Sequence, residues 1–210
     1  MGICDFHCHL LPGIDDGYLS RERFLRMLSL YRECGITTIA FTPHIYNPFV
    51  ATNIKDLRPT YAWAQQEAQK LGIATYLGSE LYVAEQDILK AVPINNRYAL
   101  VEFGLSLPPS HLLPRLKQLK QQNLTLIIAH VERYLWLEPK SAMLQKLLDL
   151  GCLLQTNVES VENKVAFPYL QAGLIDLIAT DNHGDETLPL RMMQVLNEWP
   201  DVYHKMEKMW

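Results

Sequence analysis

Seven short apolar runs alternate with segments of helical character, and this alternation constrains the fold of the 210-residue chain more than any other feature. The runs occupy residues 3–6, 37–41, 74–77, 99–101, 125–129, 153–156 and 177–180. Several of them are continuous rather than alternating, which is typical of parallel strands that are covered on both faces. The sequence therefore predicts an α/β fold with parallel strands, and this pattern alone leaves a closed barrel and an open doubly wound sheet as alternatives.

Helices are expected between these strands. Ser20 can cap a helix whose apolar face holds Phe24, Met27, Leu28 and Tyr31. Further helical segments cover about 56–71, 112–122 and 140–150. A glycine that can adopt the left-handed conformation ending a helix precedes the next strand in four places, at Gly35, Gly72, Gly151 and Gly173.

Composition narrows the class of protein. The formal net charge of −4 argues against a nucleic-acid-binding surface, which is usually basic. Four scattered cysteines without a Cys-x-x-Cys pair indicate reduced thiols in the cytoplasm. No apolar run approaches the roughly 18 residues of a membrane span, and no linker divides the chain. We therefore expect one cytoplasmic domain over residues 1–210, whose apolar C-terminal tail packs on the domain itself or on a neighbouring subunit.

Histidine or carboxylate residues follow six of the seven predicted strands. One such residue would be an ordinary structural hydrogen-bonder, but the repetition indicates a site, because active sites form at the C-terminal ends of parallel strands. Mixed histidine and carboxylate ligands suit Zn, Mn or Fe better than Ca or Mg. The candidate ligands are His7, His9, Asp16, His44, Glu80, Glu102, His130, Asp181 and His183.

The spacing of two of these pairs has a direct physical reason. Side chains two residues apart on a strand point to the same face, so His7 and His9 can reach one ion while Cys8 points away. Asp181 and His183 repeat this spacing at the last strand. The nine candidates exceed the need of one ion, and bridging carboxylates can divide them among two or three.

Six motifs, in this order, resemble the PHP (polymerase and histidinol phosphatase) superfamily: DFHCHLLPGIDDG, TPHIY, GSELYV, YALVEF, IIAHVERY and ATDNHG. The strongest resemblance is to its metal-dependent tyrosine-protein phosphatases of bacterial capsule and exopolysaccharide operons, over about residues 3–184. The resemblance implies a distorted (β/α)7 TIM-like barrel with a trinuclear site at its C-terminal mouth. The ion is most often manganese, and iron or zinc is compatible with the same ligands. The implied substrate is a phosphotyrosine-bearing protein such as a bacterial tyrosine autokinase.

Carried over motif by motif, the resemblance assigns a role to each candidate. His7, His9, Glu80 and Asp181 would hold the first ion. Glu80 would bridge to a second ion with Glu102 and His130, and the third would be held by Asp16, His44 and His183. Arg133 would contact the phosphate. A metal-bound hydroxide would attack phosphorus, and either Asp16 or a metal-site histidine such as His44 would serve as the general acid.

The chain departs from the relatives in two places. Residues 45–48 replace basic residues that tend to follow the second-strand histidine, and GDETLPLR replaces a Gly-Arg-Pro-like segment near the last strand, where Arg191 is a shifted substitute. These departures leave the metal ligands intact and bear on the preference for phosphotyrosine.

Three other functions stay open, and one is excluded. A histidinol-phosphate or other small-molecule phosphatase would use the same metals. An amidohydrolase also opens with His-x-His, although no lysine stands at a strand end here. A non-catalytic metal-binding protein would be expected to have lost ligands, and none of the nine is missing. Cysteine-based phosphatase chemistry is excluded, because no cysteine has an arginine six residues later.

Overall fold

The computed structural model describes residues 2–85 and 89–209. Its strands are β1 (Ile3–Cys8), β2 (Ile36–Phe41), β3 (His44–Ile45), β4 (Ala74–Leu77), β5 (Glu80–Tyr82), β6 (Tyr98–Glu102), β7 (Thr125–Ile128), β8 (Leu153–Asn157) and β9 (Leu177–Ala179). Its helices are α1 (Arg21–Glu33), α2 (Ile54–Lys70), α3 (Leu112–Lys120), the short 3-10 helix η1 (Val131–Arg133), α4 (Ala142–Asp149), α5 (Val158–Glu162), α6 (Phe167–Gln171), α7 (Leu188–Glu198) and α8 (Pro200–Glu207).

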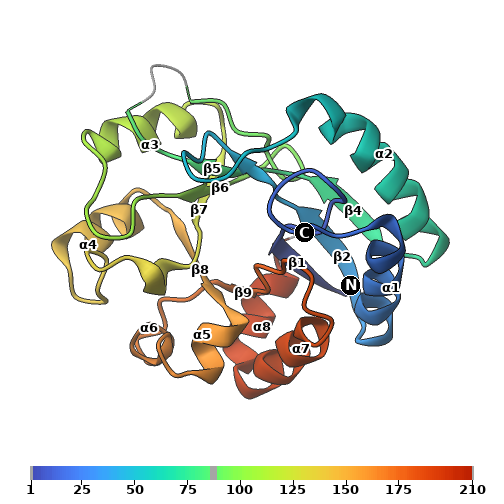
Figure 1. Cartoon of the computed structure of the whole chain (residues 1–210). Helices are drawn as coiled ribbons and strands as arrows, with labels where there is room; N and C mark the ends of the chain where they lie inside the picture. The colour runs from blue at the N-terminus through green and yellow to red at the C-terminus, as the bar shows by residue number, and fades with distance from the viewer. Residues whose placement is uncertain (1, 86–88, 210) are drawn as a thin grey trace.

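The strands form a curled parallel sheet with the helices on its outer side (Figure 1). One set of strands has the order β1-β2-β4, and the other has the order β3-β5-β6-β7-β8-β9. Neighbouring strands within each set pair in parallel. The ends of the two sets meet, because His9 N–H donates to Asn182 O at 2.9 Å and Asp181 N–H donates to His7 O at 2.8 Å. The predicted α/β class with parallel strands is therefore confirmed.

Two of the predicted strands are interrupted and resume after two residues. Residues 42–43 separate β2 from β3, and residues 78–79 separate β4 from β5. At the breaks, Gly78 N–H donates to Phe41 O at 2.8 Å and Thr42 N–H donates to Cys8 O at 3.0 Å. The sequence did not predict β3 and β5, because strands of two and three residues are too short to carry a periodic pattern.

Helix boundaries follow the sequence signals where those signals are local. The Ser20 side chain accepts a hydrogen bond from Arg23 N, so the predicted cap of α1 is confirmed. All four predicted helix-ending glycines have positive φ, between 67° and 82°. Helices α5 to α8 were not predicted, and two of them contain only five residues. A further correction concerns β1, which continues to Cys8, so that His7 lies on the strand rather than after it.

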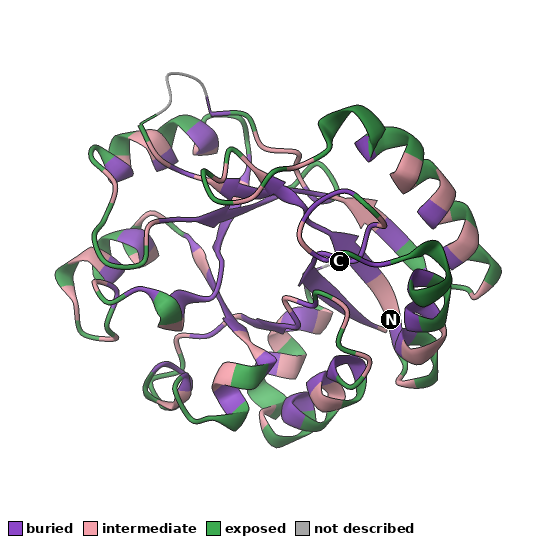
Figure 2. Ribbon diagram, viewed as in Figure 1, coloured by how far each residue is buried: buried purple, intermediate pink, exposed green. Residues whose placement is uncertain are grey.

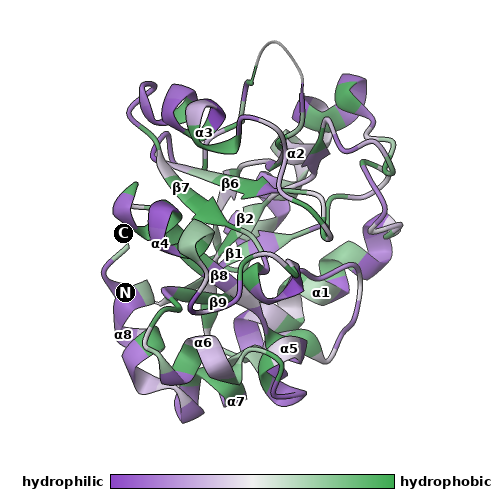
Figure 3. Cartoon of the chain, turned by 90° about the vertical axis from the view of Figure 1, so that its left-hand side faces the viewer, coloured by the Kyte–Doolittle hydropathy of each residue, from purple (hydrophilic) through white to green (hydrophobic). Residues whose placement is uncertain are grey.

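Most strands are buried along their length, whereas β4 has one exposed and two half-buried residues, and the helices expose their outer faces (Figure 2). In Figure 3, β7 is strongly hydrophobic, whereas the helices carry hydrophilic residues on their outer sides. The C-terminal helix α8 packs against β1 and β9, and Met206 and Met209 are buried. The tail thus packs on the domain as far as Met209, while Trp210 lies outside the described residues. Among the described residues, no helix has the length and apolarity to cross a membrane.

Candidate metal centre

Four ligand atoms converge on one point at the mouth of the curled sheet. The Nε2 atoms of His7 and His9 lie 3.1 Å apart. Each of them lies 3.3 Å from Glu80 Oε2 and 3.3–3.4 Å from Asp181 Oδ1. Ligands bound tetrahedrally at about 2.0–2.1 Å from a zinc-sized ion lie about 3.3–3.4 Å from one another. Five of the six distances among these four atoms are therefore those expected of ligands of one divalent cation.

The hydrogen bonds on the far side of the two imidazoles show which nitrogens are free. His7 Nδ1 lies 3.3 Å from Gln155 Oε1, and His9 Nδ1 lies 2.7 Å from Asp15 Oδ2. The main-chain N–H of His130 also donates to Gln155 Oε1, which identifies that amide atom as the oxygen. Each Nδ1–H therefore donates, as in metal-bound histidines. This arrangement directs two Nε2 lone pairs and two carboxylates at the same point, where a cation would relieve their repulsion.

Without a metal ion, protons supply the missing positive charge. Burial lowers the pKa of His7, but the negative charges of Glu80 and Asp181 outweigh this effect and raise the pKa to about 9. Burial also lowers the pKa of His9, whose hydrogen bond to Asp15 contributes to a net rise. Burial raises the pKa of Glu80 and that of Asp181, but the charge of His7 and the hydrogen bonds from neighbouring histidines together outweigh it, so both pKa values are lowered. The negative charge of the site thus favours the binding of cations.

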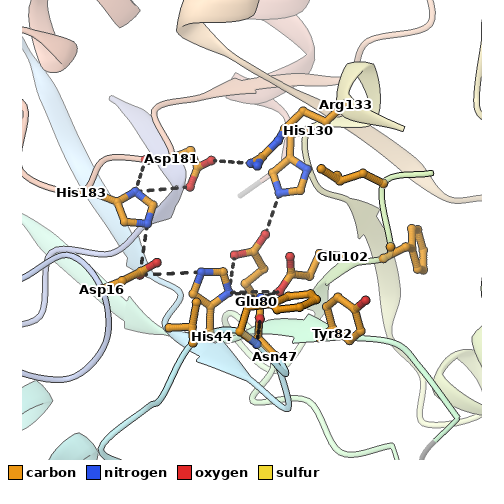
Figure 4. A pocket seen from close by; sticks show the side chains of 15 residues that line it. Asp16, His44, Asn47, Glu80, Tyr82, Glu102, His130, Arg133, Asp181 and His183 are labelled. Atoms are coloured by element: carbon orange, nitrogen blue, oxygen red, sulfur yellow. Dashed lines mark hydrogen bonds and ion pairs between the residues drawn. The ribbon is translucent and has the colours of Figure 1, made fainter. Parts of the chain in front are cut away.

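A second group of ligands contacts both oxygen atoms of the Glu80 carboxylate (Figure 4). His44 Nδ1 lies 3.0 Å from both Glu80 Oε2 and Glu102 Oε1. His130 Nε2 lies 2.8 Å from Glu80 Oε1. Because Glu80 is only 1% exposed and touches histidines through both oxygens, it is placed to bridge two cations.

A third group lies on the more open side of the site (Figure 4). Asp16 Oδ1 lies 3.2 Å from His183 Nε2 and 3.8 Å from His44 Nε2. The ring of His183 stacks on that of His9, with centroids 4.3 Å apart. Ligand atoms within 4.8 Å of one another occur in three sets, which are His7, His9 and Asp181; His44, Glu80 and Glu102; and His9, Asp16, His44 and His183.

A pocket of about 300 Å³ opens over these groups. Arg133, at the end of η1, lines it with its side chain 47% exposed, and its Nη1 lies 3.6 Å from Asp181 Oδ2. The ligands form the charged part of the lining, and its apolar part consists of Phe49, Val50, Tyr82, Phe103, Gly104 and Leu105. This arrangement suits a substrate with a compact anionic end and an apolar end.

A family model described as capsular polysaccharide synthesis, CpsB/CapC, matches residues 3–207. The chain belongs to this family. The resemblance drawn from the sequence motifs is thereby confirmed.

Relatives within the CpsB/CapC family carry names that describe an activity. The chain is 27% identical to the tyrosine-protein phosphatase CpsB of Streptococcus pneumoniae, over 90% of this chain and 86% of that protein. It is 26% identical to the putative tyrosine-protein phosphatase CapC of Staphylococcus aureus, over 92% and 82% of the two chains. The chain also matches a solved structure from a study of YwqE of Bacillus subtilis and CpsB of S. pneumoniae, which are described as metal-dependent tyrosine phosphatases. The TM-score is 0.78 and the identity 24%, over 93% of this chain and 87% of that one. That match shows the fold of the family.

All nine predicted ligands of this CpsB/CapC-family chain lie at one mouth, but they group differently from the expectation in one respect. The predicted first set, with Glu80, converges within 3.4 Å, and the predicted third set lies together. In the second set, Glu102 lies beside His44 instead of beside His130, which contacts the opposite oxygen of Glu80. His44 therefore stands between two groups, and a sequence motif carries no information about such a placement.

Several supporting residues were missed or misjudged. Asp15, which is not among the nine predicted ligands, accepts from His9 Nδ1 and from His44 N. Gln155 and Asn157 are two residues apart on β8, a spacing that places them on one face and was a usable signal. Arg191 is not a substitute phosphate ligand in this structure, because its guanidinium pairs with Glu162 and Asp185 and does not line the pocket.

Proposed function

We propose that this CpsB/CapC-family protein is a metal-dependent phosphomonoester hydrolase that dephosphorylates phosphotyrosine in a protein. The observation that carries the proposal is that the Nε2 atoms of His7 and His9 lie within 3.4 Å of carboxylate oxygens of both Glu80 and Asp181, beside the guanidinium of Arg133. The names of the relatives as tyrosine-protein phosphatases support the same activity. The apolar side of the pocket supports an aromatic leaving group.

We further propose that the nine ligands hold two or three ions, manganese first among the candidates. Bound divalent ions acidify water and offset the charge of a phosphoryl group. Gln155 and Asp15 hold the imidazoles of His7 and His9 in the orientation that leaves Nε2 free.

Arg133 would bind a phosphoryl oxygen, since its planar guanidinium matches phosphate geometry. The phenol of tyrosine has a pKa of about 10, so the leaving oxygen requires less protonation than a sugar alkoxide. Asp16 and His44, which line the pocket, would deliver that proton.

The proposal also covers the fold of the domain and the compartment in which the enzyme acts. We propose that residues 1–210 form one PHP-type domain, in which the interrupted strands β2/β3 and β4/β5 each count once in a distorted (β/α)7 barrel. The contacts of His9 and Asp181 across the two ends of the sheet support this interpretation. We propose that the enzyme acts in the cytoplasm on a bacterial tyrosine autokinase, and the four free cysteines agree with a reducing compartment.

Metal analysis combined with a substrate panel tests the proposal. Purified protein should contain a divalent metal, and it should hydrolyse a phosphotyrosine peptide faster than histidinol phosphate. Chelation should abolish the activity, whereas thiol alkylation should leave most of it. Activity that persists with negligible metal content would refute the metal mechanism, and faster turnover of histidinol phosphate would refute the substrate assignment.

A further inference from the structure

Two loops of different origin supply the apolar side of the pocket. Phe49 and Val50 lie in the loop that follows β3, and Phe103 and Leu105 lie in the loop that follows β6. Phe103 is buried and belongs to the core, but Phe49 is 86% exposed and Leu105 is 45% exposed. Large apolar side chains left in water beside a site of charged ligands commonly mark a binding surface. None of these side chains can hold a metal ion or a phosphate.

The loop that carries Phe49 is fastened to the metal site. Asn47 Nδ2 donates to Glu102 Oε1 at 2.7 Å, and the Phe49 main-chain N–H donates to Asn47 Oδ1 at 2.8 Å. Further along, Thr52 Oγ1 donates to His44 O at 2.6 Å. The loop is therefore held to two ligand residues, and Phe49 stays at the pocket although its own ring is mostly exposed. Figure 4 shows Asn47 below Glu80, on the side of the pocket that also holds Glu102 and Tyr82.

The opposite loop is held in a similar way. Leu135 N–H donates to Leu105 O at 3.1 Å, which ties the loop after β6 to the segment after η1. The Trp136 indole N–H donates to Gly104 O at 3.0 Å. The main chains of both loops are thus held by hydrogen bonds before a substrate binds, so little main-chain conformational entropy would be lost on binding.

We infer that Phe49 and Leu105 form a subsite that grips the aromatic ring of an aryl phosphate and selects aryl over alkyl phosphomonoesters. The inference rests on the proposed phosphatase function and assigns its leaving-group specificity to named residues. A phosphate held by the ligands and Arg133 would lie in the same pocket as Phe49 and Leu105. The side chains of Phe49 and Leu105 favour a phenyl ring and offer no hydrogen-bond partner for the hydroxyl groups of a sugar. Asn47, the amide that lines this part of the pocket, is already engaged with Glu102 and Phe49.

Substitution of Phe49 by alanine tests the subsite. The expected result for Phe49→Ala is a rise in KM for p-nitrophenyl phosphate and a phosphotyrosine peptide of about tenfold, the change that 1.4 kcal/mol of lost contact produces. The KM for glycerol phosphate should stay unchanged, as should kcat. Leu105→Ala should act in the same direction. Leu190→Ala is the matched control, because Leu190 is an exposed apolar residue on α7 that does not line the pocket.

Binding without turnover supplies the second measurement. Isothermal titration calorimetry of the manganese-loaded protein should show that Phe49→Ala weakens phenylphosphonate binding and leaves methylphosphonate binding unchanged. Equal losses for the aryl and methyl compounds, or no loss for either, would overturn the subsite. A wild-type protein that hydrolyses aryl and alkyl phosphates with equal KM would overturn the subsite while the phosphatase function stands. A metal-loaded wild type that hydrolyses no phosphomonoester would instead overturn the proposed function.

Discussion

Replacement of Asp15 by alanine should weaken metal binding even though Asp15 is not expected to touch a metal. The carboxylate is 6% exposed, and its Oδ2 accepts from His9 Nδ1 at 2.7 Å and from His44 N at 3.2 Å. These bonds hold the His9 ring with Nε2 facing His7 and Glu80. Without them, the His9 ring loses its orientation and its Nδ1–H is left unpaired in a buried place.

The magnitude follows from two properties of this hydrogen bond. Loss of a residue that orients a metal-bound histidine typically lowers metal affinity about 10- to 100-fold. In the metal-free protein the pair is ionised, because burial raises the pKa of Asp15 but the hydrogen bonds and charges of His9 and His44 together outweigh burial and lower it. Removing one partner of a buried ion pair costs about 3–5 kcal/mol. For a domain of this size, that loss lowers Tm by about 6–20 °C.

Asp15→Asn should fall between the wild type and Asp15→Ala. Its side-chain oxygen can still accept from His9 Nδ1, but charge-assisted hydrogen bonds are roughly twice as strong as neutral ones. The matched control is Asp149→Ala, which removes an exposed carboxylate at the end of α4. Manganese affinity is measured by calorimetry on chelator-treated protein, and Tm by differential scanning fluorimetry. An Asp15→Ala variant that binds manganese within twofold of wild type would refute the orienting role.

Two further predictions concern the ligands themselves. His9→Ala and Asp181→Ala should remove bound metal and nearly all turnover. Arg133→Ala should keep the metal and raise KM for phosphomonoesters about tenfold or more. Equal metal content and equal rates in wild type and His9→Ala would contradict the ligand assignment. In chelator-treated protein the pKa of His7 rises from its ordinary 6.5 to about 9, so the stabilisation from its protonation is complete below pH 6.5 and is lost as the pH rises through 9. The Tm of the metal-free protein should therefore fall between pH 6.5 and 9.5, and a flat profile in thermal unfolding would count against the charge balance described here.

The parts of the fold that could be predicted are those with local causes. The cap at Ser20 and the helix-ending Gly35 need only neighbouring residues, and both are as predicted. The buried strands carry apolar runs long enough to recognise. By contrast, β3 (His44–Ile45) exists because it pairs with β5, 36 positions further along, where His44 is the register partner of Glu80. Two residues have no pattern of their own, so such a strand follows from tertiary pairing alone.

The site divides in the same way. The positions of histidine and carboxylate residues after the predicted strands supplied the nine candidate ligands, and the resemblance to a known family divided them among ions. Which ligands become neighbours depends on side-chain geometry between distant residues, as when Glu102 meets His44 at 3.0 Å. The assignment of Asp16 rather than Asp15 as a metal ligand stays a prediction, and the orienting contact of Asp15 with His9 depends on how the chain turns after β1.

The backbone at the mouth shows how ligand placement and strain are linked. His130 has φ of +33° and Asp181 has φ of +51°, left-handed values that cost a non-glycine residue on the order of 1 kcal/mol or more. Each of the two residues stands two positions after the last residue of a strand, β7 or β9. The reversed φ stops the extended backbone and turns the side chain into the mouth.

The strained conformations are held by bonds from neighbouring strands. Asp181 N–H donates to His7 O, and Asn157 Nδ2 donates to Asp181 Oδ2 at 2.9 Å. Just before it, Thr180 N–H donates at 3.1 Å to Asp5, a fully buried carboxylate at the centre of β1. The polar residues that fasten the two ends of the sheet therefore also hold a ligand in a conformation it would not adopt alone. The contact between the two ends of the sheet and the assembly of the metal site thus depend on the same few hydrogen bonds. This explains why Asp5 and Asn157 are polar at positions where packing alone would favour apolar side chains.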